Sequence, residues 1–431
     1  MEDIPEQLPS YKTVTEVFDW GPAISKVIIK WIETIENEMV NNNSFKVYAR
    51  RILAEGALSP SEALKKTGVK INLGSTSKKD SDLQGYREIT SIYVSDEKGS
   101  KQQKGNYITI EMSVHPNNAL GSALNYDLST CYNNYVKPYY TIIQTNPINN
   151  KNNIIIENNK GDIRPITDKF SFHHKMNNFI SLGYASYEPP DDGKKHPLII
   201  WLHGLGEGGS DNPALPIMGN KANMFADESL QKYFGGAYVL APQCPTYWMH
   251  GVKSFMDGTS IYEEPLMGLI TSYIKEHKNL DSSRVYLGGD SNGGFMTMLL
   301  VRDYPDIFAA GFPDCGAFKK DSVTDNDIKN IAKTPLWFVS CKKDTTVPPS
   351  EIITPIVERL KKIGANVHYS LFDDIHDTSG IYKQDDGKPF EYNGHWSWVY
   401  IYNDEVEEII DGKKVKLMEW LASQKKETKL K

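Results

Sequence analysis

The sequence predicts two domains of different class, an all-β sandwich followed by an α/β domain. The first observation is length, because 431 residues exceed what one hydrophobic core usually supports. The second is a change of pattern: short β-like runs fill the chain up to residue 145, whereas strand-like and helix-like stretches alternate after about residue 170. The third is the segment 146–162 between them, which is dominated by Asn and Lys. We therefore expect a sandwich with an Asn-rich linker over 1–160 and an α/β domain over 161–431.

Four runs in the first domain carry β-branched residues between polar loops, as strands do. They are 45–49, 88–94, 107–112 and 139–143. One further segment is ambiguous, because its apolar residues from Ile24 to Ile35 recur at the spacing of an amphipathic helix. The alternative is a strand over 26–31 with Val27, Ile29 and Trp31 facing inward. The pattern alone leaves both structures open.

The second domain alternates buried strands with helices, the signature of a parallel sheet covered on its faces. The expected strands are 198–202, 237–240, 285–287, 336–339 and 369–372. The expected helices are 264–277, 294–303, 351–362 and a closing helix at 417–421.

Composition excludes several classes of function. The formal net charge of −7 argues against a nucleic-acid binder, which normally carries a basic stripe. No apolar run approaches the roughly 20 residues that a membrane-spanning helix needs. The acidic N-terminus lacks the apolar core of a signal peptide, so we expect either an intracellular protein or a secreted one whose signal peptide is absent from this chain. Four cysteines are too few for a disulfide framework, although Cys315 and Cys341 each end an apolar run and a bridge between them stays open.

The strongest chemical motif is Gly289-Asp290-Ser291-Asn292-Gly293-Gly294, which follows one predicted strand and precedes a predicted helix. This is G-x-S-x-G in the strand–turn–helix context that a nucleophile elbow requires. The serine occupies a strained turn, and its neighbours two positions away must be small so that strand and helix can approach. The pattern indicates that Ser291 is a nucleophile.

A glycine-rich loop, His203-Gly204-Leu205-Gly206-Glu207-Gly208-Gly209, follows an earlier strand. Such a loop frees backbone N–H groups to point at a developing oxyanion. We expect the amides of Leu205 and Asn292 to form this oxyanion hole. A phosphate-binding loop is disfavoured, because no GK[ST] follows.

The acid and the base should follow the nucleophile in the order Asp or Glu, then His. Asp344 lies just past a predicted strand and is the expected acid. Two histidines compete for the base, His395 and His376. His376 is flanked by three Asp residues, which would favour its imidazolium or a metal-ligand role over a poised base. We therefore expect His395 to be the base.

Four motifs in this order resemble the α/β-hydrolase fold: HGLGEGG at 203–209, GGDSNGG at 288–294, KKDTTVP at 342–348 and GHWSW at 394–398. They are most similar to the branch that holds feruloyl and acetyl-xylan esterases and polyhydroxybutyrate depolymerases. The nearest resemblance is to bacterial esterases with an N-terminal immunoglobulin-like domain, many described as prolyl-oligopeptidase-family hydrolases. It covers 170–421 strongly and 19–145 weakly. It implies a doubly wound, mostly parallel sheet preceded by an immunoglobulin-like sandwich, with 26–31 as a sandwich strand.

The resemblance implies Ser291 as nucleophile, Asp344 as acid and His395 as base of a serine carboxylic-ester hydrolase. Such an enzyme works through an acyl-enzyme and needs no metal or organic cofactor. The expected substrates are short-chain acyl esters, or feruloyl and acetyl esters of plant polysaccharides. Trp248 and Trp396 would line the substrate site and Glu207 would bind polar substrate groups, with ordinary packing and a solvated loop as the alternatives. The stretch 377–393 departs from the family pattern, and its role in substrate choice is open.

Two rival functions are a serine peptidase of the prolyl oligopeptidase class and a binding module with an inactive hydrolase. The peptidases screen substrates with a β-propeller, and about 160 residues without blade-length repeats are too few to build one. We expect no nucleic-acid or membrane partner, and the N-terminal domain is a candidate for homo-oligomerisation. The family also favours secretion over a cytoplasmic location.

Overall fold

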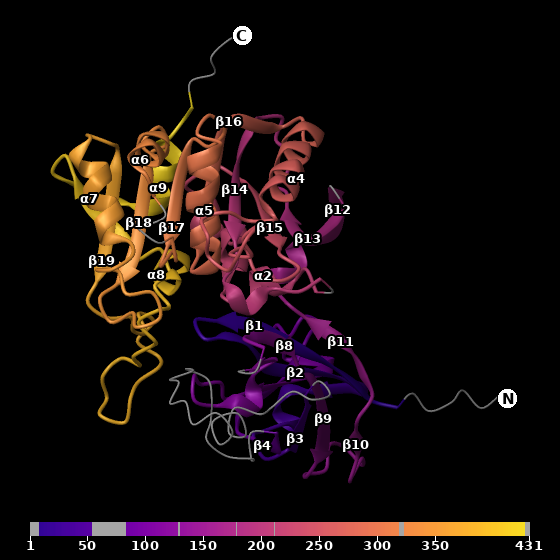
Figure 1. Cartoon of the computed structure of the whole chain (residues 1–431). Helices are drawn as coiled ribbons and strands as arrows, with labels where there is room; N and C mark the ends of the chain where they lie inside the picture. The colour runs from indigo at the N-terminus through magenta and orange to yellow at the C-terminus, as the bar shows by residue number, and fades with distance from the viewer. Residues whose placement is uncertain are drawn as a thin grey trace. The chain divides into compact units, whose positions relative to one another are not determined.

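The computed structural model describes residues 8–53, 83–127, 130–177, 179–210, 212–318 and 323–426. The chain divides into two compact units, Met1–Asp168 and Lys169–Lys431. The first unit is all-β and the second is α/β (Figure 1). The predicted fold class is therefore confirmed for both parts of the chain.

The first unit is a sandwich of two sheets with a shared apolar core. One sheet contains, in spatial order, β11 (Asn159–Ile163), β1 (Ser10–Phe18), β2 (Gly21–Glu36), β6 (Lys104–Met112) and β5 (Ile89–Ser95). The other contains β10 (Ile155–Ile156), β9 (Lys137–Gln144), β3 (Phe45–Ile52) and β4 (Gln84–Arg87). A separate pair joins β7 (Leu124–Asp127) to β8 (Tyr132–Tyr135), and short 3-10 turns lie at Asn37–Met39 and Ala119–Gly121. In the core, Trp31 packs edge-on against Phe45 with ring centroids 6.0 Å apart.

The ambiguous segment 24–35 is part of strand β2, which pairs antiparallel with both β1 and β6. Ile24, Val27, Ile28 and Ile29 are all buried, so apolar residues do not alternate with polar ones along this strand. Burial of both faces therefore produced the helix-like spacing. The strand that the family resemblance implied is the structure observed.

The segment 146–162, expected to be a linker, instead contributes two strands to the sandwich. β11 pairs in parallel with β1, and β10 pairs with β9. The hydroxyls of Thr13 and Thr15 donate to the Asp162 carboxylate at 2.7 and 2.9 Å. The chain consequently stays within the sandwich until Ile163, and the first unit ends at Asp168 rather than at 160. A polar sequence can form an edge strand because its backbone supplies the hydrogen bonds.

The second unit is built on one eight-stranded sheet. Its strands are, in spatial order, β12 (Ser171–Asn177), β13 (Ile180–Tyr187), β15 (Tyr238–Gln243), β14 (His196–Leu202), β16 (Leu280–Asp290), β17 (Ala310–Asp314), β18 (Leu336–Cys341) and β19 (Val367–Phe372). The six strands β14 to β19 run parallel to one another. The strands at one edge differ, because β12 pairs antiparallel with β13, and β13 pairs antiparallel with β15. A hairpin of β20 (Glu407–Ile410) and β21 (Lys413–Lys416) forms a separate two-stranded sheet beside β19.

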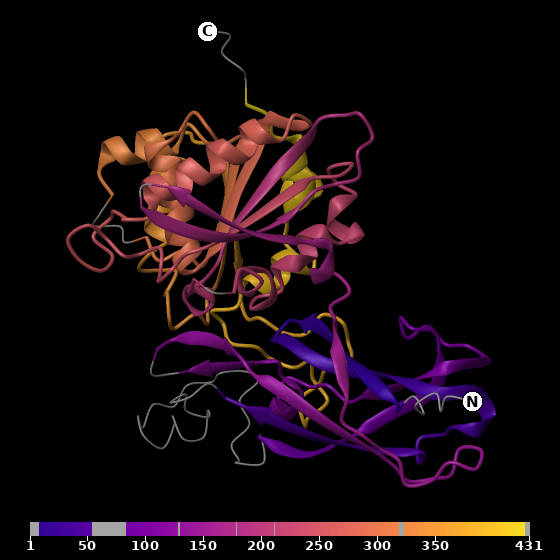
Figure 2. The same ribbon diagram turned by 90° about the vertical axis from the view of Figure 1, so that its right-hand side faces the viewer.

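Helices cover both faces of the sheet, and Figure 2 shows the yellow closing helix on the face opposite the salmon and orange ones. The helices are α2 (Leu215–Met218), α3 (Glu228–Gln231), α4 (Glu263–Glu276), α5 (Asn292–Asp303), α6 (Asp325–Ile331), α7 (Thr354–Lys362), α8 (Trp398–Tyr402) and α9 (Leu417–Ser423). Short 3-10 turns lie at η4 (Thr167–Lys169), η5 (Leu205–Glu207) and η6 (Ala222–Ala226).

The residues of β14 show how the two faces are packed. Leu198, Ile200 and Leu202 join the core beneath α4 and α5. The alternate residue Trp201 packs on the other face against Phe225 and Tyr402, from η6 and α8. This strand is buried at all seven positions, which explains its continuous apolar sequence. In open sheets of this kind, functional sites lie at the carboxyl ends of the parallel strands.

Two further expectations can be compared with the described residues. Cys315 and Cys341 are both free thiols, so the bridge left open between them is not formed. In the described part of the chain, no helix is both long enough and apolar enough to cross a membrane.

Candidate active site

Ser291 lies in a sharp turn between β16 and α5 and has a strained backbone. Its φ of 52° and ψ of −109° are rarely adopted by a residue with a side chain. A Cβ atom at Gly293 would overlap the carbonyl of Leu202, and one at Gly289 would lie 2.6 Å from the same oxygen. The elbow thus requires glycine on each side of the serine, as the motif predicts. Ser291 N–H donates to the Asp314 carbonyl at 2.9 Å, which ties the turn to β17.

The side chains of Ser291, His395 and Asp344 form a continuous chain of hydrogen bonds. His395 Nε2 lies 3.0 Å from Ser291 Oγ, and His395 Nδ1 lies 2.8 Å from Asp344 Oδ2. A carboxylate oxygen only accepts, so Nδ1 carries the proton and Nε2 presents its lone pair to the serine hydroxyl. This is the tautomer that a general base needs.

Asp344 is held by the turn that follows β18. Its second oxygen, Oδ1, accepts the amides of Thr346 and Val347 at 2.8 and 2.9 Å. The side chain is fully buried. These amide bonds fix the carboxylate so that Oδ2 points to the imidazole.

The loop that carries His395 approaches the Asp344 turn closely. A Cβ atom at Gly394 would lie 2.5 Å from the Lys343 carbonyl oxygen and 2.8 Å from the Asp344 nitrogen. The His395 amide donates to the Asn393 side chain at 2.9 Å, and the Trp398 ring packs edge-on against the imidazole with centroids 5.5 Å apart. A glycine before the histidine therefore sets the approach, and an aromatic residue after it orients the ring.

The two expected oxyanion donors lie at the starts of short helical segments. Asn292 is the first residue of α5, and its amide has no acceptor within the helix. Leu205 is the first residue of η5, in the glycine-rich loop. The Asn292 side chain has a second role that the sequence did not reveal: its Oδ1 accepts the Met249 amide at 3.0 Å, which holds the segment after β15 beside the elbow.

His203 fixes the glycine-rich loop from inside the protein. Its Nδ1 pairs with the Gly204 carbonyl, and its Nε2 accepts the Cys244 amide at 2.9 Å. Burial lowers the pKa of His203 to about 4, so the ring is neutral near pH 7. The sequence placed this histidine in the motif but gave no indication of its bridging contact.

Three buried acids lie next to the elbow: Glu207, Asp290 and Asp314. Burial is the main cause that raises the pKa of Asp290 well above its usual range, and the nearby acids Glu207 and Asp314 add to it. Burial likewise raises the pKa of Asp314 to about 8. Asp290 and Asp314 face each other as register partners on β16 and β17. Buried acids of this kind are common near functional sites.

The structure distinguishes the three residues expected to contact substrate. Trp248 is fully buried against His203 and Tyr262, so it belongs to the core and cannot line a substrate site. Glu207 is 2% exposed and lies with the buried acids. It is therefore neither part of a solvated loop nor exposed to a substrate at the surface. Trp396 is half-buried beside His395 and stacks with Tyr392 and Trp398. Of the three, only Trp396 keeps an exposed face next to the candidate triad.

Cys315 lies close to the acid and the base. The donor atoms of Cys315, Asp344 and His395 lie within 4.8 Å of one another, a spacing that a metal ion can bridge. Two of these atoms are already joined in the His395–Asp344 hydrogen bond. The thiol is buried, contacts Asp314 Oδ2 at 3.2 Å and has a pKa raised by burial. The arrangement therefore fits a hydrogen-bonded dyad beside a neutral thiol.

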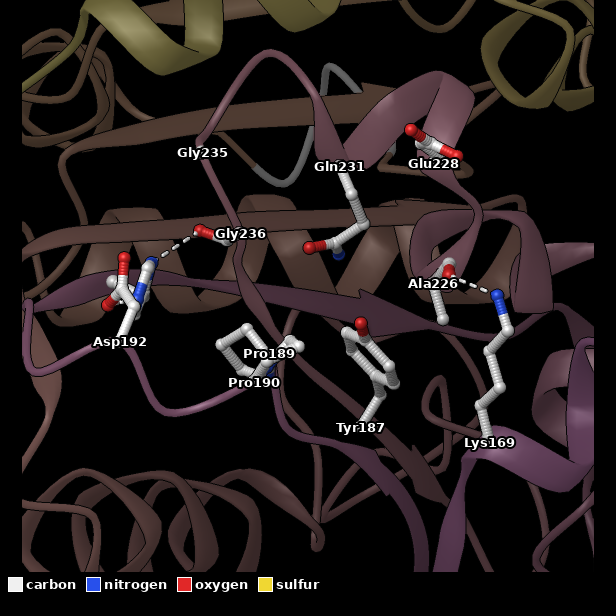
Figure 3. A pocket seen from close by; sticks show the side chains of 11 residues that line it. Lys169, Tyr187, Pro189, Pro190, Asp192, Ala226, Glu228, Gln231, Gly235 and Gly236 are labelled. Atoms are coloured by element: carbon white, nitrogen blue, oxygen red, sulfur yellow. Dashed lines mark hydrogen bonds and ion pairs between the residues drawn. The ribbon is translucent and has the colours of Figure 1, made fainter.

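A surface pocket of about 310 Å³ lies elsewhere on this unit (Figure 3). Its lining includes Tyr187, His196 and Gln231, and His196 is at the start of β14, at the end of the strand away from the glycine-rich loop. His196 is engaged by Asp192 at 2.8 Å and by the Gly236 carbonyl at 3.1 Å. Gln231 is satisfied by the backbone of Phe225 and Ala237. His196 and Gln231 therefore already pair with other groups of the protein, and we assign this pocket no role in the reaction at Ser291.

Comparison with known proteins gives the same two-part division. Residues 10–157 match the model of the esterase Ig-like N-terminal domain, and residues 267–328 match that of the prolyl oligopeptidase family. The second match begins within α4, includes β16, the elbow, α5 and β17, and ends within α6.

Two curated proteins are similar over shorter stretches. Feruloyl esterase B from Neurospora crassa is 29% identical over 127 residues, covering 29% of this chain and 41% of that protein. Acetylxylan esterase A from Aspergillus ficuum is 25% identical over 154 residues, covering 35% of this chain and 46% of that protein. The chain thus spans less than half the length of each of these relatives.

One solved structure, described as the crystal structure of a thermostable esterase, resembles nearly the whole chain. The two share 23% sequence identity and a TM-score of 0.73, over 96% of this chain and 99% of the other. At that identity the likeness establishes the fold. The chain therefore combines an esterase-type immunoglobulin-like domain with a domain of the α/β-hydrolase fold, which confirms the resemblance found in the sequence.

Proposed function

We propose that this chain is a serine carboxylic-ester hydrolase with Ser291 as nucleophile, His395 as general base and Asp344 as its acidic partner. The observation that carries the proposal is the uninterrupted contact from Ser291 Oγ to His395 Nε2 at 3.0 Å and from His395 Nδ1 to Asp344 Oδ2 at 2.8 Å. A nucleophile, a base and an orienting group within hydrogen-bond reach are the signature of an activated serine. The strained elbow adds support, since it holds Oγ clear of the sheet.

The reaction follows from the protonation states of these groups. Ser291 Oγ attacks the ester carbonyl while its proton moves to His395 Nε2, and Asp344 stabilises the imidazolium that forms. Collapse of the tetrahedral intermediate breaks the ester C–O bond, and Nε2 returns the proton to the leaving alcohol. Water then attacks the acyl-enzyme with the same base, which releases the acid and restores Ser291.

The oxyanion that forms in both steps needs donors that are already in place. In this proposal the amides of Leu205 and Asn292 supply them, each contributing about 3 kcal/mol of transition-state stabilisation, as is typical of such donors. The neutral ring of His203 supports one donor by holding the Gly204 carbonyl. The tie between the Asn292 side chain and Met249 supports the other.

The substrates we propose are acetyl, short-chain acyl or feruloyl esters, including those attached to plant polysaccharides. The support is the similarity to the feruloyl and acetylxylan esterases, together with the half-buried ring of Trp396 beside His395. A flat phenolic ring stacks well on an exposed aromatic face. Since these polysaccharides are extracellular, the proposal includes a secreted protein. Homo-oligomerisation through the first unit stays a proposal that size-exclusion chromatography can test.

A serine peptidase is the second candidate, because residues 267–328 match the prolyl oligopeptidase family model. The described part of the first unit is a two-sheet sandwich, which argues against the propeller-based screening of that class. An acyl-enzyme mechanism serves both esters and amides, so only the substrate distinguishes the two candidates.

The test is a fluorophosphonate probe followed by a substrate panel. The panel contains p-nitrophenyl acetate, butyrate and octanoate, methyl ferulate, acetylated xylan and a prolyl peptide amide. We expect labelling and ester hydrolysis in the wild type, and loss of both in Ser291→Ala with little change in melting temperature. The matched control is Ser283→Ala, on the same strand β16 but outside the site. Ester hydrolysis by Ser291→Ala within tenfold of wild type contradicts the proposal, and preference for the peptide amide favours the peptidase.

A further inference from the structure

Two buried acids connect the segments that hold the candidate oxyanion donors and the nucleophile. Glu207 lies in η5, two residues after Leu205, and Asp290 directly precedes Ser291. The side-chain amide of Asn220 joins them, with Nδ2 at 2.9 Å from Asp290 Oδ2 and at 3.3 Å from Glu207 Oε2. Asp290 is 0% exposed and Glu207 is 2% exposed.

Backbone encloses this acid pair tightly. A Cβ atom at Gly204 would lie 2.6 Å from Asp290 Oδ2 and 3.3 Å from Glu207 Oε2, and one at Gly219 would lie 2.6 Å from Glu207. The Asp290 carboxyl therefore lies against the first residues of the glycine-rich loop. A change in its charge or position reaches that loop directly.

The groups that face Asp290 are acidic or neutral. They are Glu207 from η5, Asp314 and Cys315 at the end of β17, Tyr402 from α8 and the amide of Asn220. Asp290 Oδ1 has no hydrogen-bond partner within the described residues. Two carboxylates this close in a low-dielectric interior cannot both ionise without a large penalty. The pKa of Asp290 is accordingly raised well above its usual range, with burial as the largest cause.

A neutral Asp290 suits the chemistry of the neighbouring serine. Negative charge develops on the substrate oxygen in the transition state, and a carboxylate buried directly behind Ser291 would oppose it. In the neutral form the two acids and Asn220 can form a hydrogen-bonded link between the loop and the elbow. Ionisation of Asp290 keeps the Asn220 donor in place but adds repulsion from Glu207 and Asp314, which opposes the seating of the loop.

We propose that Asp290 is a positioning residue that acts as a neutral acid, and that through Asn220 and Glu207 it seats the loop 204–207 against the nucleophile elbow. This inference rests on the proposed esterase function and adds a regulation of that site by pH. Loss of the Asp290 proton separates the loop from the elbow and lowers kcat more than it changes KM.

The test measures kcat for p-nitrophenyl acetate from pH 6 to pH 10 in the full chain and four variants, Asp290→Asn, Glu207→Gln, Asp314→Asn and Asp306→Asn. Asp290→Asn keeps the shape and stays neutral, so we expect the alkaline fall in kcat to move to higher pH or disappear, with kcat at pH 7 reduced by no more than about fivefold. Glu207→Gln removes one repelling acid and lowers the pKa of Asp290, so the fall moves to lower pH. Asp306→Asn, an exposed acid on the same unit, is the control and should leave the profile unchanged.

Opposite shifts in two isosteric variants distinguish this role from simple packing, and the melting temperature at each pH shows whether a variant stays folded. The proposal is overturned if the alkaline limb of Asp290→Asn superimposes on that of wild type, or if Asp314→Asn alone removes the limb. Fluorophosphonate labelling of Ser291 at pH 7 reports the triad separately. A wild type that is labelled and active but has unshifted variant profiles therefore refutes this inference and leaves the proposed function standing.

Discussion

Two histidine–aspartate pairs lie near each other in sequence, and only one has the geometry of a catalytic base. His395 Nδ1 lies 2.8 Å from Asp344, and His376 Nδ1 lies 2.8 Å from Asp374. His395 has Ser291 at its second nitrogen and a side chain that is 12% exposed, against a fully buried Asp344. The His376 side chain is 43% exposed, and its Nδ1 also contacts the Tyr400 hydroxyl at 3.0 Å.

The comparison teaches that an aspartate partner does not by itself make a base. Asp374 also lies 3.7 Å from Lys343 Nζ. Its side chain is in contact with solvent, where an ion pair contributes little to stability. Asp344 receives two backbone amides and is shielded from water. A base needs a fixed acceptor on one nitrogen and a nucleophile on the other, and only the His395 pair has both.

The largest expected effect separates the two histidines directly. His395→Ala removes the group that accepts the Ser291 proton, so we expect kcat to fall by about 10³-fold or more. His376→Ala changes an exposed pair and should reduce kcat by less than about threefold. Steady-state kinetics on p-nitrophenyl acetate, with the melting temperature as a check on folding, decides between them. A collapse in His376→Ala with a mild effect in His395→Ala would reverse the roles.

The sequence left His395 and His376 as alternatives for the base. We expected His395 because three aspartates flank His376 and would favour its charged form. The sequence could indicate the elbow and the His395 loop because close backbone approaches require glycine, so the elbow glycines and Gly394 are visible in the sequence even though the segments that they approach are distant. The buried acid group was not predictable, since Glu207, Asn220 and Asp290 come from three distant segments. The burial of Trp248 was not predictable either, because it results from packing against His203 and Tyr262, which are not its neighbours in the sequence.

The fold shows the same division between local and non-local information. Apolar runs such as 198–202 and 336–339 predicted central strands, because those strands are buried on both faces. Strand β17 was missed because its five residues include a glycine and a proline, which are poor strand formers. Strand β11 was taken for a linker because its polar sequence pairs with β1, which is far away along the chain. Strand β10 was included because its two isoleucines lie in an otherwise polar stretch.

A smaller effect is expected at Gly394, which allows the His395 loop to approach the Asp344 turn. A methyl group there would press on the Lys343 carbonyl and the Asp344 amide. We expect Gly394→Ala to lengthen the His395–Asp344 contact and lower kcat by about tenfold, because small misplacements of catalytic groups are costly. KM should change less than kcat.

The matched control is Gly85→Ala in the first unit, where, among the described residues, the added atom would meet the Leu120 side chain of the same unit at 3.5 Å, an ordinary contact. Equal kcat values for Gly394→Ala and wild type would show that the base tolerates a shifted loop. The contact of His395 with Ser291 would then be the feature that distinguishes it from His376, and the exact geometry of its contact with Asp344 would not matter.

The last expected effect concerns stability rather than catalysis, because the acids around the two histidines differ in burial. Burial raises the pKa of Asp314 to about 8, whereas the Lys342 ammonium lowers the pKa of exposed Asp373. An acid with a raised pKa holds its proton longer in the folded state than in the unfolded state. The free energy of unfolding therefore falls as pH rises from about 4 to about 8, by at most about 1.4 kcal/mol per pH unit from this group.

Asp314→Asn removes that titration, so we expect its melting temperature relative to wild type to rise steadily between pH 5 and pH 8. Asp373→Asn is the control, because an exposed acid should give a nearly constant difference over the same range. Thermal unfolding followed by circular dichroism at half-unit pH steps measures both. A constant offset between Asp314→Asn and wild type would mean that Asp314 is already ionised at pH 5, which would place a negative charge beside the Ser291 turn throughout the working range. The buried acids would then raise the barrier to oxyanion formation, and the contrast between the two histidines would depend on hydrogen-bond geometry alone.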